Sequence, residues 1–356
     1  MGVDLLHGGN RQAVAEVLGC RPSQLLDASA SLAPWTPSCP RRLLQASLRD
    51  YPDRDQGSLR CAFAALHGLP PDWVLPGNGA AELFTWAARD AASAGLSGLL
   101  APGFADYRRA LNCWDAASVD TPLALSGVHL GPLHHPCLDG SVAWICNPHN
   151  PTGQLWSRTS LEAMLEHYAL VIVDEAFLPL VPEAEHQSMI SLVMQYPNLV
   201  VIRSLTKLFG VAGMRIGYAI AHPDRLRRWS AWRDPWPVNG VAAALTEQWL
   251  GKPGLYKRWC SRVQRWTKTE GSWIQRELSR VPGITPMPSS ANFLLISGRR
   301  SLVPLRETLE KNYWILLRDC RSFTGLGERW LRIGLQSPRD NRRIVRALRQ
   351  VQRLSC

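Results

Sequence analysis

The chain has 356 residues, of which 46% are hydrophobic and 19% charged, and its formal net charge at pH 7 is +11. This length allows one large domain or two, and the composition is that of an ordinary folded protein. No run of about 18 apolar residues predicts a membrane span, and residues 1–10 lack the basic start and apolar core of a secretory signal. We therefore expect a cytoplasmic protein without a membrane partner.

The cysteines and the basic residues narrow the function classes further. The nine cysteines are scattered singly, without the paired spacing of a zinc site, so we expect them to stay reduced and to bind no metal. Basic residues gather at 225–228, 252–268 and 339–353, the last two with helical periodicity. No nucleic-acid-binding motif accompanies them, so we expect no specific nucleic-acid partner. The positive charge instead favours attraction of small phosphorylated anions.

The order of the predicted helices and strands along the sequence divides the chain into three parts. Residues 1–40 are predicted to be an arm, in which Asp27–Pro34 is a strand end running into an extended loop. From about residue 70 to 222 short apolar strands alternate with helices, which predicts an α/β domain with a doubly wound, mainly parallel sheet. The strands of this part are expected at 98–102, 142–146, 170–173 and 199–202, and its helices at 80–89, 103–110 and 161–167. Two further helices, 39–49 and 59–67, precede it.

The C-terminal part predicts a smaller α/β domain. Residues 241–280 have the pattern of two amphipathic helices or of one long kinked helix. A loop and strand at 286–296, strands at 313–318 and 329–334, and helices at 302–312 and 338–354 are expected to follow. The predicted boundaries are thus an arm at 1–40 that contributes to the site and the small domain, a large domain at 41–245 and a small domain at 246–356.

The most informative stretch is Ser204–Tyr218, which follows the apolar run Leu199–Ile202. It offers a hydroxyl, an amine and a guanidinium from Ser204, Lys207 and Arg215, in a segment that we expect to be a loop broken by glycines. An amine that forms a Schiff base with an aldehyde, beside groups that hold a phosphate, is the chemistry that such a set can perform.

Four other segments place candidate residues at the same edge of the predicted sheet. A Gly77-Asn-Gly79 turn opens a helix whose first amides could bind a phosphate. Phe104, Asn150 and Asp174 follow other predicted strands, and Asp174, at the end of a buried strand, requires a partner for its carboxylate. Ligands of α/β sheets bind at the carboxyl ends of the strands, so we expect these residues to converge with Lys207 in one site.

The pattern S-x-T-K-x-x-x-x-x-G-x-R-x-G-Y over 204–218 resembles the lysine motif of fold-type I pyridoxal-phosphate (PLP) enzymes, the aspartate aminotransferase superfamily. The resemblance covers nearly the whole chain and implies the large and small domains of that fold. It implies that Lys207 is the catalytic lysine that binds PLP covalently and moves protons. The other implied PLP contacts are Asp174 to the ring nitrogen, Asn150 to the ring hydroxyl, Phe104 stacked on the ring, and Gly79, Ala80, Ser204 and Arg215 at the phosphate.

Two further roles follow from the same resemblance. Tyr51, in a Tyr-Pro-Asp turn, matches a tyrosine that reaches the cofactor phosphate of the partner subunit, which implies a homodimer. Arg332, in Leu-Arg-Ile-Gly, matches the arginine that holds the substrate carboxylate in a bidentate pair.

Within the superfamily the chain resembles the histidinol-phosphate aminotransferase and threonine-phosphate decarboxylase families. The segments at 7–10, 27–34, 103–110 and 174–177 look more like the decarboxylase. That family uses an arginine fourteen residues before the carboxylate-binding one to contact the substrate phosphate. Arg318 matches this position, with His7 assisting and Ser31 in the substrate-binding arm.

The sequence departs from the family patterns at two places. Ser31 and Ala33 replace asparagines of the arm motif, and Phe177 replaces a tyrosine that bonds the cofactor in most of the aminotransferases. Loss of that tyrosine hydroxyl weakly disfavours transamination. We expect decarboxylation of O-phospho-L-threonine to (R)-1-amino-2-propanol phosphate and carbon dioxide, in cobalamin biosynthesis. The alternatives are glutamate-dependent histidinol-phosphate transamination, or a non-catalytic protein that binds nucleic acid through its basic helices.

Overall fold

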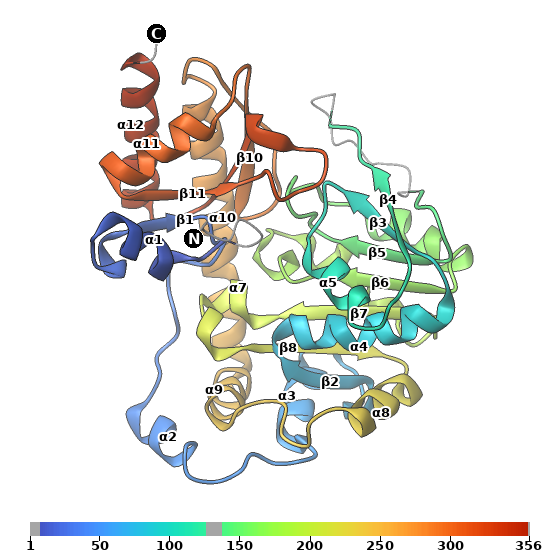
Figure 1. Ribbon diagram of the computed structural model, residues 1–356. Coiled ribbons are helices and arrows are strands. Elements are labelled where there is room, and N and C mark those ends of the chain that lie inside the picture. Colours follow the sequence, from blue (N-terminus) through green and yellow to red (C-terminus); the bar gives the residue numbers. More distant parts are fainter. Residues whose placement is uncertain (1–7, 126–136, 355–356) are drawn as a thin grey trace.

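A computed structural model describes residues 8–125 and 137–354 of the chain, and within these residues two sheets form its framework (Figure 1). The larger sheet has seven strands, in the order β2 (Val74–Asn78), β8 (Ile216–Ala221), β7 (Leu199–Ser204), β6 (Leu170–Asp174), β5 (Val142–Cys146), β3 (Ser97–Ala101) and β4 (Ser118–Pro122). All run parallel except β8, which is antiparallel to both of its neighbours. The expected mainly parallel sheet is confirmed.

The central strands of this sheet are buried on both faces, which explains their uninterrupted apolar sequences. In β6, Leu170 and Ile172 join one hydrophobic cluster and Val171 and Val173 join the other. One face is covered by α4 (Gly79–Ala94), α5 (Asp106–Asn112) and α8 (Pro223–Trp232). The other face is covered by several elements, among them α3 (Gly57–His67), α6 (Arg158–Glu162), α7 (Leu205–Phe209) and α9 (Gly240–Leu250).

The smaller sheet joins the two ends of the chain. Its order is β1 (Leu26–Ala28), β11 (Ile315–Asp319), β12 (Trp330–Gly334), β10 (Phe293–Gly298) and β9 (Ile284–Pro286). The N-terminal segment with α1 (Arg11–Leu18) supplies β1, which pairs in parallel with β11. The chain then runs from this sheet to α2 (Arg41–Ala46) at the far end of the molecule (Figure 1). The arm therefore contributes one strand, β1, to the small sheet.

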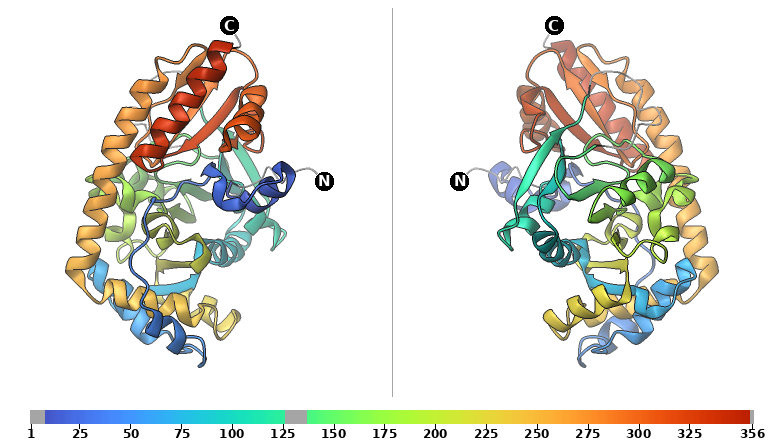
Figure 2. Two further views of the ribbon diagram at one scale, coloured as in Figure 1. Left: turned by 90° about the vertical axis from the view of Figure 1, so that its left-hand side faces the viewer. Right: turned by 90° about the vertical axis from the view of Figure 1, so that its right-hand side faces the viewer.

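Three helices complete the C-terminal part. The longest, α10 (Pro253–Leu278), runs along one side of the molecule past both sheets (Figure 2). It belongs to the same hydrophobic cluster as α12 (Pro338–Leu354) and α11 (Val303–Tyr313). No helix within the described ranges is long and apolar enough to cross a membrane.

Most expected elements are present with small shifts of their ends. Of the two alternatives for residues 241–280, the structure has the two helices, α9 and α10, which are separated at Gly251–Lys252. Two details differ from expectation. The lysine segment is not a loop throughout, because Lys207 lies on the short helix α7. The edge strand β4 was not predicted, since its sequence Ser-Val-Asp-Thr-Pro is only partly buried and carries no apolar run.

Candidate active site

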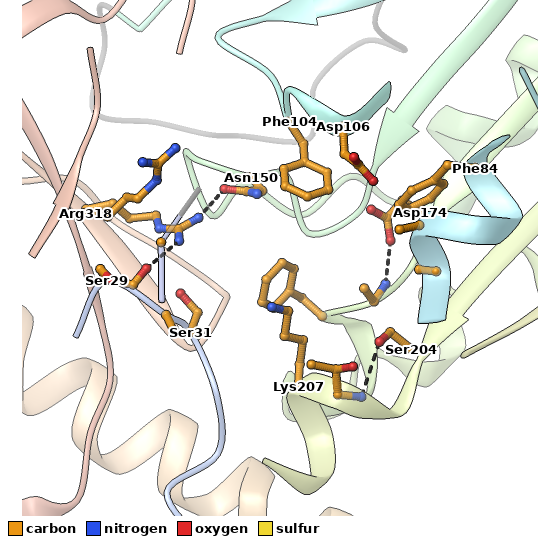
Figure 3. Close-up of a pocket in the computed structure, with 18 of the residues that line it drawn as sticks. Ser29, Ser31, Phe84, Phe104, Asp106, Asn150, Asp174, Ser204, Lys207 and Arg318 are labelled. Atoms are coloured by element: carbon orange, nitrogen blue, oxygen red, sulfur yellow. Dashed lines mark hydrogen bonds between the residues drawn. The ribbon is translucent and has the colours of Figure 1, made fainter. Parts of the chain in front are cut away.

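A cavity of about 210 Å³ lies where the carboxyl ends of the large sheet meet the arm and the small sheet (Figure 3). Its walls come from segments that follow β2, β3, β5, β6 and β7, and from β11, β12 and residues 29–31 of the arm. The structure therefore brings together most of the predicted site residues: Ser31, Ala80, Phe104, Asn150, Asp174, Ser204, Lys207, Arg215, Arg318 and Arg332.

Lys207 is held on α7, the single helical turn that follows β7. The Ser204 hydroxyl caps this turn by accepting a hydrogen bond from the Thr206 amide at 3.2 Å, and Gly210 ends it with φ of 64°. The amine extends into the cavity, where Nζ lies 5.5 Å from the centre of the Phe177 ring (Figure 3). Burial, and then the nearby Arg332 guanidinium, lower the pKa of Lys207 from 10.5 to about 8. The amine is thus available as a nucleophile close to neutral pH.

Asp174 ends β6 with a buried carboxylate. One of its oxygens, Oδ1, accepts the Ala176 amide at 2.9 Å, and Oδ2 accepts the Tyr107 hydroxyl at 2.6 Å. Burial raises the pKa of Asp174, while these two hydrogen bonds and the Lys207 amine oppose the shift. The carboxylate also lines the cavity, so it is placed to accept a further donor from a bound molecule.

The start of α4 and the end of the lysine segment form a second wall. Gly79 has φ of +74°, and a Cβ at this position would collide with Nη2 of Arg215. A Cβ on Gly217 of β8 would lie 2.9 Å from the Ala80 amide nitrogen. Close approach of these segments therefore requires glycine at both places. It brings the first amides of α4, the Ser204 hydroxyl and the Arg215 guanidinium to one corner of the cavity, which suits a phosphate group.

Arg332 is buried, and both ends of its guanidinium are held by the protein. Nη1 donates to Oδ1 of Asn150, and Nη2 donates to the Ser29 carbonyl at 3.1 Å. Its Nε has no hydrogen-bond partner among the described residues, and neither does the buried Ser31 hydroxyl in the same cavity. These two buried polar groups are therefore donors available to a molecule bound in the cavity.

Arg318 lies beside Arg332. Its Nη2 donates to the Ser322 hydroxyl at 2.7 Å, and its guanidinium lies 5.0 Å from the centre of the Phe323 ring. Burial and then the charge of Arg318 lower the pKa of Arg332 to about 10. Two buried cations in one small cavity attract anionic groups strongly.

Comparisons with known proteins agree with this geometry. The family model described as aminotransferase class I and II matches residues 24–348. A threonine-phosphate decarboxylase of Salmonella typhimurium is 34% identical, over 97% of this chain and 96% of that protein. A histidinol-phosphate aminotransferase of Symbiobacterium thermophilum is 33% identical, over 86% of this chain and 84% of that protein.

The chain belongs to the aminotransferase class I and II family. A solved histidinol-phosphate aminotransferase of Sinorhizobium meliloti, in complex with pyridoxal-5′-phosphate, has the same fold, with a TM-score of 0.81 and 20% identity. That structure covers 100% of this chain, and this chain covers 96% of it. The fold-type I assignment is confirmed.

PLP is the cofactor of this aminotransferase family, and the residues present fit it. The cavity supplies an amine of lowered pKa for the aldehyde, a buried carboxylate for the ring nitrogen and a glycine-dependent corner for the phosphate. Phe104 lines the same cavity with its ring exposed to the space between Asn150 and Asp174 (Figure 3). The residues thus share one cavity, and the individual contacts to the cofactor stay predictions.

Of the remaining predicted site residues, Tyr51 lies away from the cavity and His7 is not among the described residues. Tyr51 is 79% exposed, stacks on Trp236 with ring centres 4.5 Å apart, and does not line the cavity of its own chain. A role for Tyr51 in a partner subunit stays a prediction. His7 lies outside the described residues, although Gly8, which follows it, lines the cavity.

Two residues that were not predicted from the sequence hold side chains of the site in place. Ser29 supplies the carbonyl that holds Arg332, and the Tyr107 hydroxyl donates to the Asp174 carboxylate. A signal for Tyr107 exists in its spacing, since it follows Phe104 by one helical turn. Among the described residues, no group of three or more histidine, cysteine or acidic side chains could hold a metal ion.

Proposed function

We propose that this enzyme decarboxylates O-phospho-L-threonine to (R)-1-amino-2-propanol phosphate and carbon dioxide, as a step of cobalamin biosynthesis. The observation that carries the proposal is the placement of Arg318 and Arg332 in one small cavity with Lys207. Two buried guanidinium groups suit a small substrate that carries both a carboxylate and a phosphate. The end-to-end match to the Salmonella protein named threonine-phosphate decarboxylase supports the same substrate.

The two arginines bind different groups of the substrate. Arg332 binds the carboxylate, because its Nε is buried without a partner among the described residues. The Ser31 hydroxyl, also buried without such a partner, donates to the same end of the substrate. Arg318 binds the phosphate, and His7 of the preceding segment assists it.

Bound PLP would be held by groups that converge on the other side of the cavity. Asp174 would hold the ring nitrogen, Asn150 would bond the ring hydroxyl, and Phe104 would lie against the ring, since all three line the cavity. Gly79, Ala80, Ser204 and Arg215 would hold the phosphate. Asn150 also accepts from Arg332, so one amide links the cofactor pocket to the carboxylate site.

In the reaction, the bond from the amino-bearing carbon to the carboxylate breaks, carbon dioxide leaves, and the bonding electron pair stays behind. PLP, when bound, supplies the electron sink that stabilises this negative charge. Lys207 then donates a proton to the carbon that has lost the carboxylate, which balances the reaction. Because Asn150 and Ser29 hold Arg332 from two sides, the protein fixes the direction in which the carboxylate is presented.

A second candidate is histidinol-phosphate aminotransferase, which the Symbiobacterium relative of that name favours at 33% identity. Phe177 supports the decarboxylase instead. Its ring packs on Phe293 at 5.0 Å and lies near Lys207 without a hydroxyl to donate. The hydrogen bond to the cofactor that a tyrosine would supply there is therefore absent from this side chain.

We further propose that the enzyme is a homodimer of the cytoplasm, in which Tyr51 reaches the cofactor phosphate of the other subunit. The high exposure of Tyr51 and of its stacking partner Trp236, 40% exposed, supports a contact surface at this place.

The test of the reaction type compares two substrate conditions on the same PLP-loaded protein: a single substrate and a donor–acceptor pair. O-Phospho-L-threonine alone should yield amino-propanol phosphate over many turnovers. Glutamate with imidazole-acetol phosphate should give no sustained amino transfer. Efficient formation of histidinol phosphate, without product from phosphothreonine, would replace the decarboxylase by the aminotransferase.

A further inference from the structure

Tyr107 and Asp174 share a buried hydrogen bond that the reaction as described above does not use. The Tyr107 hydroxyl donates to Oδ2 of Asp174 at 2.6 Å, and the two residues are 5% and 4% exposed. The other groups that face the carboxylate are the Ala176 amide at 2.9 Å, the Cys146 thiol at 3.8 Å and the Lys207 amine. Tyr107 therefore makes the shortest contact with the carboxylate that is expected to hold the cofactor ring nitrogen.

The position of the Tyr107 hydroxyl is fixed by aromatic packing. Its ring meets Phe84 edge-on at 5.1 Å and Phe104 edge-on at 5.5 Å, and it lies 5.3 Å from Trp144. These contacts come from α4, from the segment before α5 and from β5. Tyr107 is also absent from the residues that line the cavity, so it acts on a bound molecule only through Asp174.

The hydrogen bond from Tyr107 influences whether the Asp174 carboxyl group is ionised or protonated. Burial raises the pKa of Asp174 and so favours the neutral acid, and the hydrogen bond from Tyr107 is the largest influence that opposes this shift. Burial also raises the pKa of Tyr107 well above its ordinary value, so its hydroxyl remains a donor. A donor that stays protonated, aimed at a buried carboxylate, stabilises the ionised form of that carboxylate.

We propose that Tyr107 is a positioning residue that keeps the Asp174 carboxylate ionised, so that the ring nitrogen of the bound cofactor carries the proton. Without this hydroxyl, the carboxylate retains the Ala176 amide and the weak thiol donor Cys146. It then takes the proton from the ring, and the uncharged ring withdraws electrons less strongly. The inference concerns the family cofactor rather than the substrate, so it stands or fails separately from the decarboxylase proposal.

The test compares wild-type, Tyr107→Phe and Tyr168→Phe holoenzymes loaded with PLP that carries ¹⁵N in its ring. Tyr168 is a matched control, because its buried hydroxyl contacts the backbone of Leu138 at 2.8 Å and lies outside the cavity. The nitrogen resonance should indicate a protonated ring in wild type and Tyr168→Phe, and should move toward the unprotonated position in Tyr107→Phe. This readout requires no substrate and no turnover.

Steady-state kinetics supply a second readout. Loss of a hydrogen bond to a charged group should lower kcat of Tyr107→Phe by about tenfold or more, with little change of KM, because neither arginine is altered. A nitrogen resonance in Tyr107→Phe identical to that of wild type would overturn the inference. Equal losses of thermal stability in both variants, with no such shift, would show that Tyr107 only packs the core.

Discussion

Arg318 and Arg332 are directly opposed partners in the antiparallel pairing of β11 with β12. Like charges at opposed positions destabilise a sheet, and these two are 4% and 6% exposed. Their proximity contributes to lowering the pKa of Arg332 to about 10. In the proposed function, an anionic substrate bound between them would offset this repulsion.

The phosphate role of Arg318 predicts a specific kinetic defect. Arg318→Met should raise KM for O-phospho-L-threonine by about 10- to 100-fold, because one charge-assisted contact is lost while methionine keeps an unbranched side chain at this position. Activity toward unphosphorylated threonine should be unchanged. Equal losses on both substrates, measured in parallel, would contradict a phosphate contact.

The lowered pKa of Lys207 predicts how cofactor capture depends on pH. Only the unprotonated amine attacks an aldehyde, so with a pKa of about 8 the rate at which apoprotein captures PLP should rise from pH 6.5 and level off near pH 9. An ordinary lysine would still be rising at pH 10. The measurement is the growth of visible absorbance after mixing across this range. A midpoint near 10.5, or capture by Lys207→Gln, would refute the assignment.

The backbone at Gly79 predicts a defect confined to the phosphate corner. Gly79→Ala places a Cβ against Arg215 at φ of +74°, so PLP affinity should fall about tenfold or more. Gly213→Ala is the matched control, since a Cβ there has no neighbour within 4 Å and its φ is not positive. Equilibrium titration of both apoproteins with PLP measures the difference. Equal affinities would show that the close contact is not needed.

The proposed contribution of Tyr51 across subunits predicts complementation. Tyr51→Ala and Lys207→Ala are each expected to be inactive or nearly so, and in a mixed dimer both lesions fall on the same site and leave the other site intact. After subunit exchange in equal amounts, roughly a quarter of the wild-type activity should return, since half of the dimers then hold one intact site. No recovery despite demonstrated exchange would contradict the shared site.

The sequence predicts the large sheet well because its central strands are buried on both faces. Leu170–Val173 and Leu199–Ile202 are continuous apolar runs, and the residues that follow them define the site. By contrast, β4 is a half-exposed polar edge strand whose pairing depends on β3, so its own residues carry no pattern.

Contacts between residues that are far apart in the sequence cannot be predicted from the hydrophobic pattern of single strands or helices. The hydrogen bond between Tyr107 and Asp174 joins residues 67 positions apart, and the one between Arg332 and the Ser29 carbonyl spans 303. The helical state of Lys207 was also missed, because Gly210 and Gly213 suggested a loop although Gly210 ends a helix. The two hydrogen bonds arise from packing between distant elements, which local sequence does not encode.

The central claim is tested most directly by counting carbon dioxide released from carboxyl-labelled O-phospho-L-threonine by PLP-loaded protein, with no keto acid present. The account predicts release that continues for many equivalents per active site, matched by amino-propanol phosphate and abolished in Arg332→Met. Conversion of the cofactor to its amine form in a single equivalent, with no labelled gas, would contradict it.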